Sequence, residues 1–380
     1  MRFAKLYSIP LTAALVAQAF PQVLAAEPKI PPGAGMSAST FVENQGLYIS
    51  DGIRSKPDKG VPLYKQFISL NLSTAWESDA PAWTDLIYRE TKDEYDGQGT
   101  MTITKDGDAL IFFDDRIIHN YDIKSKQWIQ EYSMNWTSHL FSGGIVTDLD
   151  TGLIYGMEGL MGRAKNHEVN PDDPWKFTEF NPVDKSFTSV EKRGPPAALD
   201  LISMVYSSVA KRIFGYEPNQ LHDNKEALWS YNITSKDWTP VNATGDIPPL
   251  RSYPCFVSAY GGKKLILAGG LGIKPIAILN DVYSLDVSTL TWTKLANMPL
   301  TVVGHSCAVS GDSFVAMGGL TDWVVANDEG PAILNLTSNT WGKRYTPTPP
   351  GQTPSSADRT HLTLSKAVFV ALAVSSLITL

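Results

Sequence analysis

Short runs of apolar residues that end in small or turn-forming residues recur through most of the chain. The runs read GLYISDG, ALIFFDD, GLIYGMEG, RIFGYEP, KLILAGG and SFVAMGG. Another short apolar run precedes each of them and ends in a tight turn, as in MTITKDGD, CFVSAYGGK and CAVSGD. Runs of this length between Gly, Asp, Ser and Lys are typical of β-strands joined by hairpins. The pattern therefore predicts a series of paired short strands.

A polar residue followed by a large aromatic residue is the second recurring signal, as in YSLDVSTLTW, HNYDIKSKQW and WSYNITSKDW. The polar residues are Asn71, Asp122, Asn181, Asn232, Asp286 and Asn335. The aromatic residues that follow five or six positions later are Trp76, Trp128, Phe187, Trp238, Trp292 and Trp341. Asp or Asn followed by Ser, Thr or Lys favours a polar hairpin turn, because its side chain accepts hydrogen bonds from free backbone amides.

The motif has a period close to 50 residues, since its polar residue recurs at spacings of 51, 59, 51, 54 and 49. Each period holds four short strands. One four-stranded sheet cannot bury both faces, whereas sheets arranged radially bury each face against a neighbour. The aromatic residue would open the outermost strand and cover the gap to the neighbouring sheet. The sequence therefore predicts an all-β fold, a six-bladed β-propeller with four antiparallel strands per blade over residues 38–345.

The glycine pairs and the aromatic positions resemble the kelch motif. Di-glycine ends an apolar strand at Gly269–Gly270 and at Gly318–Gly319, and Trp stands six residues after Asp or Asn. The fifth repeat adds Arg251 in PPLRSYP, and the sixth adds GHSCAV. The first four repeats replace the glycine pair, which leaves single blade boundaries there open. The resemblance is greatest to secreted and surface kelch-repeat proteins of fungi, and implies a central domain like that of galactose oxidase without its copper site.

The N-terminus resembles a secretory signal peptide. Residues 1–26 begin with Arg2 and Lys5, continue with an apolar stretch and end in the small residues Ala25 and Ala26. This order is typical of a cleaved signal, with a membrane anchor as the alternative. We therefore expect the chain to enter the secretory pathway.

The C-terminus resembles the signal for a glycosylphosphatidylinositol anchor. A polar spacer rich in Pro, Ser and Thr occupies residues 346–366, with small residues at a candidate attachment site, Ser355. The apolar tail, residues 367–380, would reach about 21 Å as a helix, less than the roughly 30 Å of a hydrocarbon core. Lipid attachment after removal of the tail would place the protein outside the cell, on its surface. A short tail anchor or a tail buried in the fold are the alternatives.

The net charge argues against a nucleic-acid partner, and the sequons mark candidate glycosylation sites. Lys and Arg number 32 against 39 Asp and Glu, so the chain has no basic footprint for nucleic acid. Sequons Asn-x-Ser/Thr begin at Asn71, Asn135, Asn232, Asn242 and Asn335. These asparagines are candidates for glycosylation at the surface of a secreted protein.

The two cysteines, Cys255 and Cys307, permit a single disulfide in an oxidising compartment. Alignment of PCFVS with SCAVS would give them the same place on the innermost strands of blades five and six. A bond requires Cα atoms within about 6.8 Å, and innermost strands of neighbouring blades could be farther apart. Bonded and free cysteines therefore both remain possible.

Binding residues are expected in long loops at one mouth of the propeller channel, since kelch-type propellers use that face and loops on a rigid scaffold carry function. Our candidates combine aromatic rings with groups that hydrogen-bond, which suits a sugar, peptide or small polar ligand. They are Trp323, Arg163, His167, Arg251, Trp83 and Tyr253. Each also has a structural alternative: Arg251 could brace the blade ends, Trp83 could cover a blade edge and His167 could be solvated.

An enzymatic role lacks a coherent motif. A copper radical site needs two His and two Tyr at one metal, and none of the six histidines is preceded by Tyr or paired as His-x-His. We predict no catalytic residue, metal or cofactor. The sequence indicates a secreted, surface-anchored interaction module that recognises a protein or carbohydrate ligand. The alternative is a secreted kelch-type enzyme, an oxidase or natural-product tailoring enzyme, with its active site at the channel mouth.

Overall fold

A computed structural model describes residues 37–52, 65–89, 99–113, 117–133, 144–157, 177–190, 202–216, 227–322 and 325–348. β-Strands dominate these residues, and the one helix among them is the short 3-10 turn η4 (Tyr260–Gly262). Within this part of the chain, no helix has the length and apolar character needed to cross a membrane. The segments predicted as signal peptide (1–26) and apolar tail (367–380) lie outside the described residues.

Among the described residues, six antiparallel sheets share one plan of four strands, which we number sheet 1 to sheet 6 in chain order. Sheet 1 contains β1 (Ala38–Val42), β2 (Gly46–Ser50), β3 (Phe67–Asn71) and β5 (Trp83–Asp85). Sheet 2 contains β6 (Thr100–Ile103), β7 (Ala109–Phe113), β8 (Ile117–Asp122) and β9 (Gln127–Ser133). Sheet 3 contains β10 (Ile145–Thr147), β11 (Ile154–Met157), β12 (Phe177–Asn181) and β13 (Ser186–Val190).

The second half of the chain repeats the plan. Sheet 4 contains β14 (Ser203–Ser207), β15 (Arg212–Tyr216), β16 (Leu228–Asn232) and β17 (Asp237–Pro240). Sheet 5 contains β20 (Cys255–Ala259), β21 (Lys264–Ala268), β24 (Val282–Asp286) and β25 (Thr291–Lys294), with β18 (Thr244–Gly245) added in parallel to β25. Sheet 6 contains β26 (Ser306–Ser310), β27 (Ser313–Met317), β30 (Ala332–Asn335) and β31 (Thr340–Gly342).

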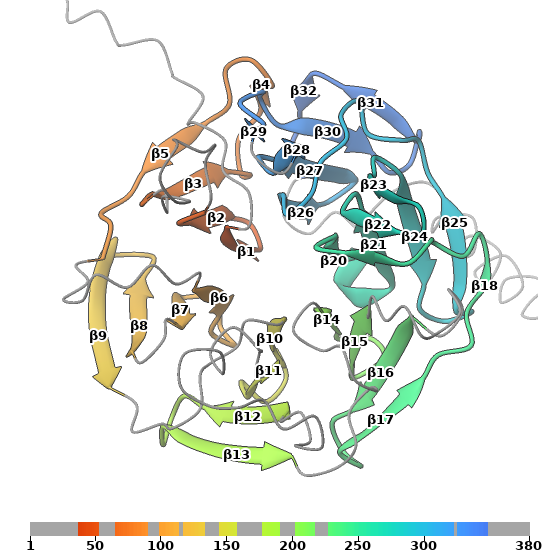
Figure 1. Cartoon of the computed structure of the whole chain (residues 1–380). Helices are drawn as coiled ribbons and strands as arrows, with labels where there is room; N and C mark the ends of the chain where they lie inside the picture. Colours follow the sequence, from red (N-terminus) through yellow and green to blue (C-terminus); the bar gives the residue numbers. More distant parts are fainter. Residues whose placement is uncertain are drawn as a thin grey trace, which may run out of the picture.

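The sheets stand around a common centre as a β-propeller, with the first strand of each sheet innermost (Figure 1). Each innermost strand contacts those of the neighbouring sheets in the order β1, β6, β10, β14, β20, β26 and back to β1. The predicted strand pairs are therefore present, and the first and last sheets of the chain are neighbours.

The hydrophobic core consists of separate clusters between neighbouring sheets. The β7 strand of sheet 2 shows why, since all five of its residues are buried. Leu110 and Phe112 face the cluster shared with sheet 1, whereas Ile111 and Phe113 face the cluster shared with sheet 3. Side chains alternate between the two faces of a strand, so a strand covered on both sides is apolar throughout. This explains the uninterrupted apolar runs in the sequence.

The recurring polar residue forms the predicted hairpin turn. The side-chain oxygen of Asn232 accepts the backbone N–H groups of Thr234 and Ser235 at 2.9 and 3.3 Å, and Asp286 accepts those of Ser288 and Thr289 at 2.9 and 3.1 Å. Corresponding bonds occur at Asn71, Asp122, Asn181 and Asn335. Such bonds replace backbone partners in a turn. The interpretation of the motif as a turn signal is confirmed.

The recurring aromatic residue packs between sheets, as expected. The six residues belong to or pack against the clusters shared with the preceding sheet in the ring, and they are Trp76, Trp128, Phe187, Trp238, Trp292 and Trp341. Two indoles also hydrogen-bond across the junction: Trp128 Nε1 donates to Ile87 O at 2.7 Å, and Trp341 Nε1 donates to Ala296 O at 3.1 Å. The aromatic positions therefore join neighbouring sheets.

Sheet 1 departs from the predicted strand order. Trp76 was expected to open its outermost strand, but β5 (Trp83–Asp85) takes that place. Trp76 instead begins β4 (Trp76–Glu77), which pairs with β32 (Arg344–Tyr345) from the end of the described chain. The reason is the ring of Tyr345, which stacks on Trp76 with centroids 4.8 Å apart and requires this position. The expectation for Trp76 was wrong because a distant segment occupies the space.

Tyr345 closes the ring between sheets 6 and 1. Its side chain is fully buried, and its hydroxyl donates to Leu72 O at 2.7 Å and contacts Ser310 Oγ at 3.0 Å. Leu72 follows the third strand of sheet 1, and Ser310 ends the first strand of sheet 6. One phenol therefore links the two ends of the chain.

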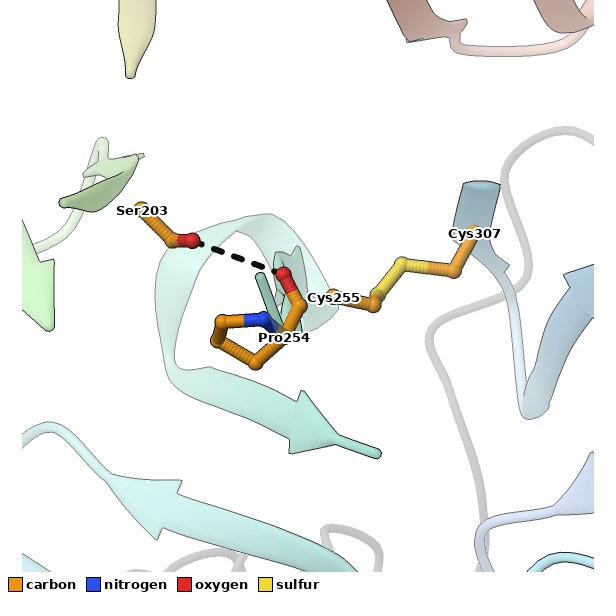
Figure 2. Close-up of a disulfide and its surroundings, with 4 residues drawn as sticks. All are labelled: Ser203, Pro254, Cys255 and Cys307. Carbon is orange, nitrogen blue, oxygen red and sulfur yellow. Dashed lines mark hydrogen bonds between the residues drawn. A yellow bond between two sulfur atoms is a disulfide. The ribbon is translucent and has the colours of Figure 1, made fainter. Parts of the chain in front are cut away.

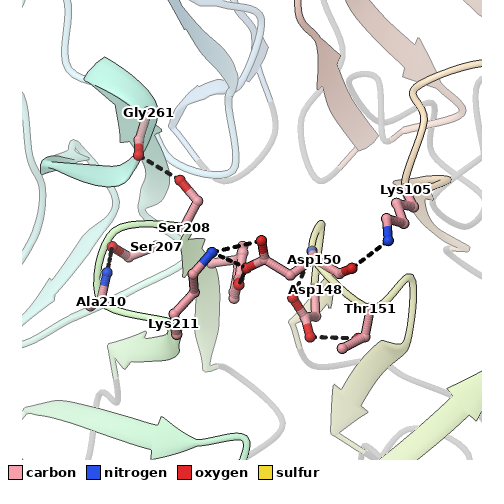
Figure 3. Close-up of polar contacts among 10 residues, drawn as sticks. Lys105, Asp148, Asp150, Thr151, Ser207, Ser208, Ala210, Lys211 and Gly261 are labelled. Atoms are coloured by element: carbon pink, nitrogen blue, oxygen red, sulfur yellow. Dashed lines mark hydrogen bonds and ion pairs between the residues drawn. The ribbon is translucent and has the colours of Figure 1, made fainter.

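The tight turns between first and second strands lie on one face of the ring, which we call the turn face. Hydrogen bonds join these turns across successive junctions. They run from Gln45 Nε2 to Gly107 O, Lys105 Nζ to Asp150 O, Lys211 Nζ to Asp150, Ser208 Oγ to Gly261 O, and Tyr260 OH to Asp312 Oδ1. Figure 3 shows the middle of this series, where Asp150 lies between Lys105 and Lys211. Hydrogen bonds from Lys211 and Tyr206 hold the pKa of Asp150 below its usual value.

Replacing Tyr345 by Phe should lower the free energy of unfolding by about 1–3 kcal/mol, because the buried Leu72 carbonyl and Ser310 hydroxyl lose a partner. Tyr231→Phe is a matched control, since Tyr231 is equally buried and its hydroxyl has no hydrogen-bond partner in the described part of the chain. Urea unfolding of both variants tests this. Equal effects of the two substitutions would show that the Tyr345 hydroxyl does not stabilise the closure.

Candidate functional site

The face opposite the turn face, which we call the mouth face, carries two projecting hairpins. In sheet 5 the hairpin consists of β22 (Leu271–Ile273) and β23 (Ile276–Ile278), and in sheet 6 of β28 (Leu320–Asp322) and β29 (Val325–Ala326). Each follows a glycine pair at the end of a second strand. Long loops were expected at one mouth of the channel, whereas these segments are short strand pairs over neighbouring sheets (Figure 1).

The hairpins expose apolar side chains. Ile276 is 77% exposed beside the turn between β22 and β23, and Val325 is 46% exposed at the start of β29. Both residues lie on strands that end their small sheets, so their outer backbone edges have no paired strand in the described chain. Exposed edges and large apolar side chains favour contact with another molecule. The two hairpins are therefore the strongest candidate for a binding surface.

Arg251 anchors the sheet 5 hairpin from below. Its side chain is fully buried, and Nη1 and Nη2 donate to the Asp281 carboxylate at 2.5 and 3.0 Å. The same guanidinium donates to Pro249 O and Gly269 O. The backbone of Arg251, in β19 (Arg251–Ser252), pairs with Gly272 of β22. Arg251 therefore braces the hairpin and is not available to a ligand, and removing its charge would cost about 3–5 kcal/mol.

A second buried ion pair, not anticipated from the sequence, lies on the mouth face of sheet 1. Asp51 occupies the place of the first motif glycine, with a positive φ of 58°. Its carboxylate accepts from Arg89 Nη2 at 3.0 Å and from the Tyr88 hydroxyl. The Arg89 guanidinium also lies 3.6 Å from the ring centroid of Phe112 in sheet 2. Arg89 therefore contacts both sheet 1 and sheet 2. In the sequence, the one sign of this site was that SDG stands where later repeats have a glycine pair.

His305 is a buried histidine between the two glycine pairs. It precedes β26, is 7% exposed, and neither ring nitrogen has a hydrogen-bond partner among the described residues. A Cβ at Gly269 would lie 2.8 Å from its Cε1, and one at Gly319 would lie 2.9 Å from its Cβ. The glycine pairs therefore make room for this side chain. Burial lowers the pKa of His305 to about 4, so the imidazole is neutral at pH 7.

The other candidate binding residues have different positions. Trp83 opens β5 and packs against the cluster between sheets 6 and 1. Tyr253 is half-buried with a φ of 52°, and its carbonyl accepts the Gly304 N–H at 3.1 Å. Arg163, His167 and Trp323 lie outside the described residues. Of the three candidates within the described residues, Arg251 and Tyr253 lie two residues apart just before β20, and Trp83 lies in sheet 1.

Cys255 and Cys307 are joined by a disulfide that links sheets 5 and 6 (Figure 2). Their Cα atoms are 6.2 Å apart, within the range for such a bond. The alignment predicted the same place on the two strands for these residues, but the structure places them one position apart. Cys255 is the first residue of β20 and pairs with Ala268, whereas Cys307 is the second residue of β26. The alignment was wrong by one residue because matching PCFVS to SCAVS at the cysteines does not keep the pairing of each strand with the next one.

Three sequons coincide with hairpin turns. Asn71, Asn232 and Asn335 each use the side-chain oxygen to accept the backbone N–H of the Ser or Thr two residues later. The turn alone therefore explains the Asn-x-Ser/Thr spacing at these positions. Asn242 is exposed and follows β17, whereas Asn135 lies outside the described residues.

The described residues contain no group of three or more His, Cys, Asp or Glu side chains that could hold a metal ion. The two buried guanidiniums each already bond a carboxylate, Arg251 with Asp281 and Arg89 with Asp51. The two hairpins of the mouth face combine exposed apolar side chains with exposed charged ones, such as Lys274 and Asp322.

Comparison with known proteins places the C-terminal half of the chain beside kelch repeats. Residues 201–373 match the family model described as the KLHDC2/KLHL20/DRC7 Kelch-repeats domain. This segment includes sheets 4 to 6, the buried Arg251–Asp281 pair and both mouth-face hairpins.

Similar curated proteins come from fungi. The chain is 28% identical over 129 residues to Tip elongation aberrant protein 1 of Schizosaccharomyces pombe, 26% identical over 128 residues to a Kelch repeat-containing protein of Arthroderma benhamiae, and 25% identical over 171 residues to Kelch-like protein terF of Aspergillus terreus. These matches cover 32%, 30% and 44% of this chain. They cover 11%, 19% and 33% of the relatives, so the chain spans at most a third of their length.

Asn335→Ala should lower the free energy of unfolding by about 1 kcal/mol, because the turn amides of Thr337 and Ser338 lose their acceptor. Asn335→Asp should retain stability, since Asp286 makes the corresponding bonds in sheet 5. Both variants lack the sequon, so their intact masses report any glycan at this position. Urea unfolding of the unglycosylated variants tests the turn, and equal losses with Ala and Asp would contradict it.

His305→Leu should remove two buried nitrogens without partners and keep or raise stability at pH 7. Below pH 6.5 the unfolded chain protonates His305, whereas the folded protein resists protonation until about pH 4. The wild type should therefore lose about 3 kcal/mol more than the variant between pH 7 and pH 4. Denaturant titrations at a series of pH values measure this difference. Parallel pH profiles for the two proteins would exclude a buried neutral imidazole.

Proposed function

We propose that the chain is a kelch-repeat protein, that its six sheets are the six blades of a closed kelch propeller, and that the mouth face of this propeller binds a protein or carbohydrate partner. The observation that carries the proposal is the pair of hairpins on neighbouring sheets 5 and 6, which expose Ile276 and Val325. The sheet 5 hairpin is held by the buried ion pair of Arg251 and Asp281. A rigid support with exposed apolar tips suits recognition by surface contact.

The proposed location of this module is the cell surface. Support comes from the sequence, in the predicted signal peptide at residues 1–26 and the predicted lipid attachment at Ser355. The disulfide between Cys255 and Cys307 is compatible with an oxidising compartment. In this proposal the exposed Asn242 carries a glycan, and the mouth face meets partners outside the cell.

The test is binding to peptide and glycan arrays by the full chain and two charge variants. Ile276→Asp places a charge on the mouth face, and Val183→Asp places one on an 88% exposed residue in the turn between β12 and β13. We expect Ile276→Asp to weaken binding at least tenfold, or about 1.4 kcal/mol, and Val183→Asp to leave it unchanged. Equal binding by both variants, or loss only with Val183→Asp, would rule out the hairpins as the binding surface.

A further inference from the structure

The chain leaves the described fold on the turn face. Tyr345 inserts between sheets 6 and 1 and contacts Ser310, the last residue of β26. Thr348, at the end of the described chain, lies against the turn between β26 and β27, because a Cβ added to Gly311 would overlap its side chain. That turn is at the opposite end of β26 from the β28–β29 hairpin. Whatever follows Thr348 therefore starts on the face opposite the hairpins.

The distance from this exit to the proposed lipid attachment is short. Ser355 is seven residues beyond Thr348, and seven extended residues span at most about 25 Å. To bring the mouth face to a bilayer, the chain would pass around the rim of the ring. This path covers about 14 Å across the sheet, from its first to its fourth strand, and about 17 Å more along a five-residue strand. The peptide part of the tether is shorter than this path even before the hairpins are added, so contact of the mouth face with the bilayer would also need the length of the anchor glycan.

We propose that the turn face of the propeller faces the lipid bilayer and that the mouth face, with both hairpins, points away from it. This inference rests on the lipid anchor proposed at Ser355. Exposed apolar side chains occur on both faces, with Val209 57% exposed in the turn between β14 and β15 and Ile276 on the mouth face. The point where the chain leaves the described fold, rather than apolar exposure, is therefore the basis of this orientation.

The experiment places a fluorophore on one face at a time. Cys255 and Cys307 are bonded to each other, so an added cysteine is the one free thiol of the described chain. Val209→Cys labels the turn face and Ile276→Cys labels the mouth face. The full chain, expressed in yeast, is recovered in native membranes, labelled, and supplied with phospholipids that carry a nitroxide quencher on the headgroup. We expect severalfold stronger quenching of the label at position 209 than of the label at position 276.

Cleavage with a phosphatidylinositol-specific phospholipase supplies the control. It should release both labelled proteins from the membrane and abolish quenching of the label at position 209. Stronger quenching at position 276, or equal quenching at both positions in membrane-bound protein, would overturn the orientation and leave the anchor intact. A full chain that does not sediment with membranes before cleavage would overturn the anchor and the orientation together, while the mouth-face binding test stays independent of both.

Discussion

The structure depends on one constraint, which is that every sheet is apolar on both faces and must be covered by a neighbour on each side. β21 of sheet 5 illustrates this, with Leu265 and Leu267 in the cluster shared with sheet 4, and Ile266 and Ala268 in the cluster shared with sheet 6. No sheet is stable alone under this arrangement, and a row of sheets would leave two open apolar faces. Closing the ring removes both faces, which explains why the Tyr345 side chain is fully buried between sheets 6 and 1.

The two faces of the ring differ in how their connecting segments contribute to the junctions between sheets. On the turn face, the tight turns bond one another across the junctions, so a change in any of these turns affects the contact between two sheets. On the mouth face, the hairpins β22–β23 and β28–β29 extend beyond the strands that form the junctions. Buried ion pairs hold the base of this face, where Arg251 bonds Asp281 and Arg89 bonds Asp51. Variation in the hairpins therefore costs the ring little, which suits a surface that recognises partners.

Local features of the fold were predictable from the sequence, because turns and alternating faces leave short patterns. Asp286 and Trp292 mark a turn and the strand that follows it, and the same spacing of six residues identifies sheets 2, 3, 4 and 6. Closure by Tyr345 was not predictable, since its partner Trp76 is more than 250 residues away in the chain. One sign was present: Trp76 follows its Asn after five residues rather than six. The role of Arg251 was left open because the sequence does not show whether an arginine binds a ligand or pairs with a buried carboxylate such as Asp281.

The disulfide shows how the ring geometry decides which residues can meet. Equivalent positions on two neighbouring inner strands point the same way around the ring, so only one of the two side chains points into the junction between those strands. A shift of one residue turns a side chain to the other face of its strand. Cys255 at the first position of β20 and Cys307 at the second position of β26 therefore both point into the junction between sheets 5 and 6, where both belong to one cluster. The offset that the alignment missed is the condition for the bond.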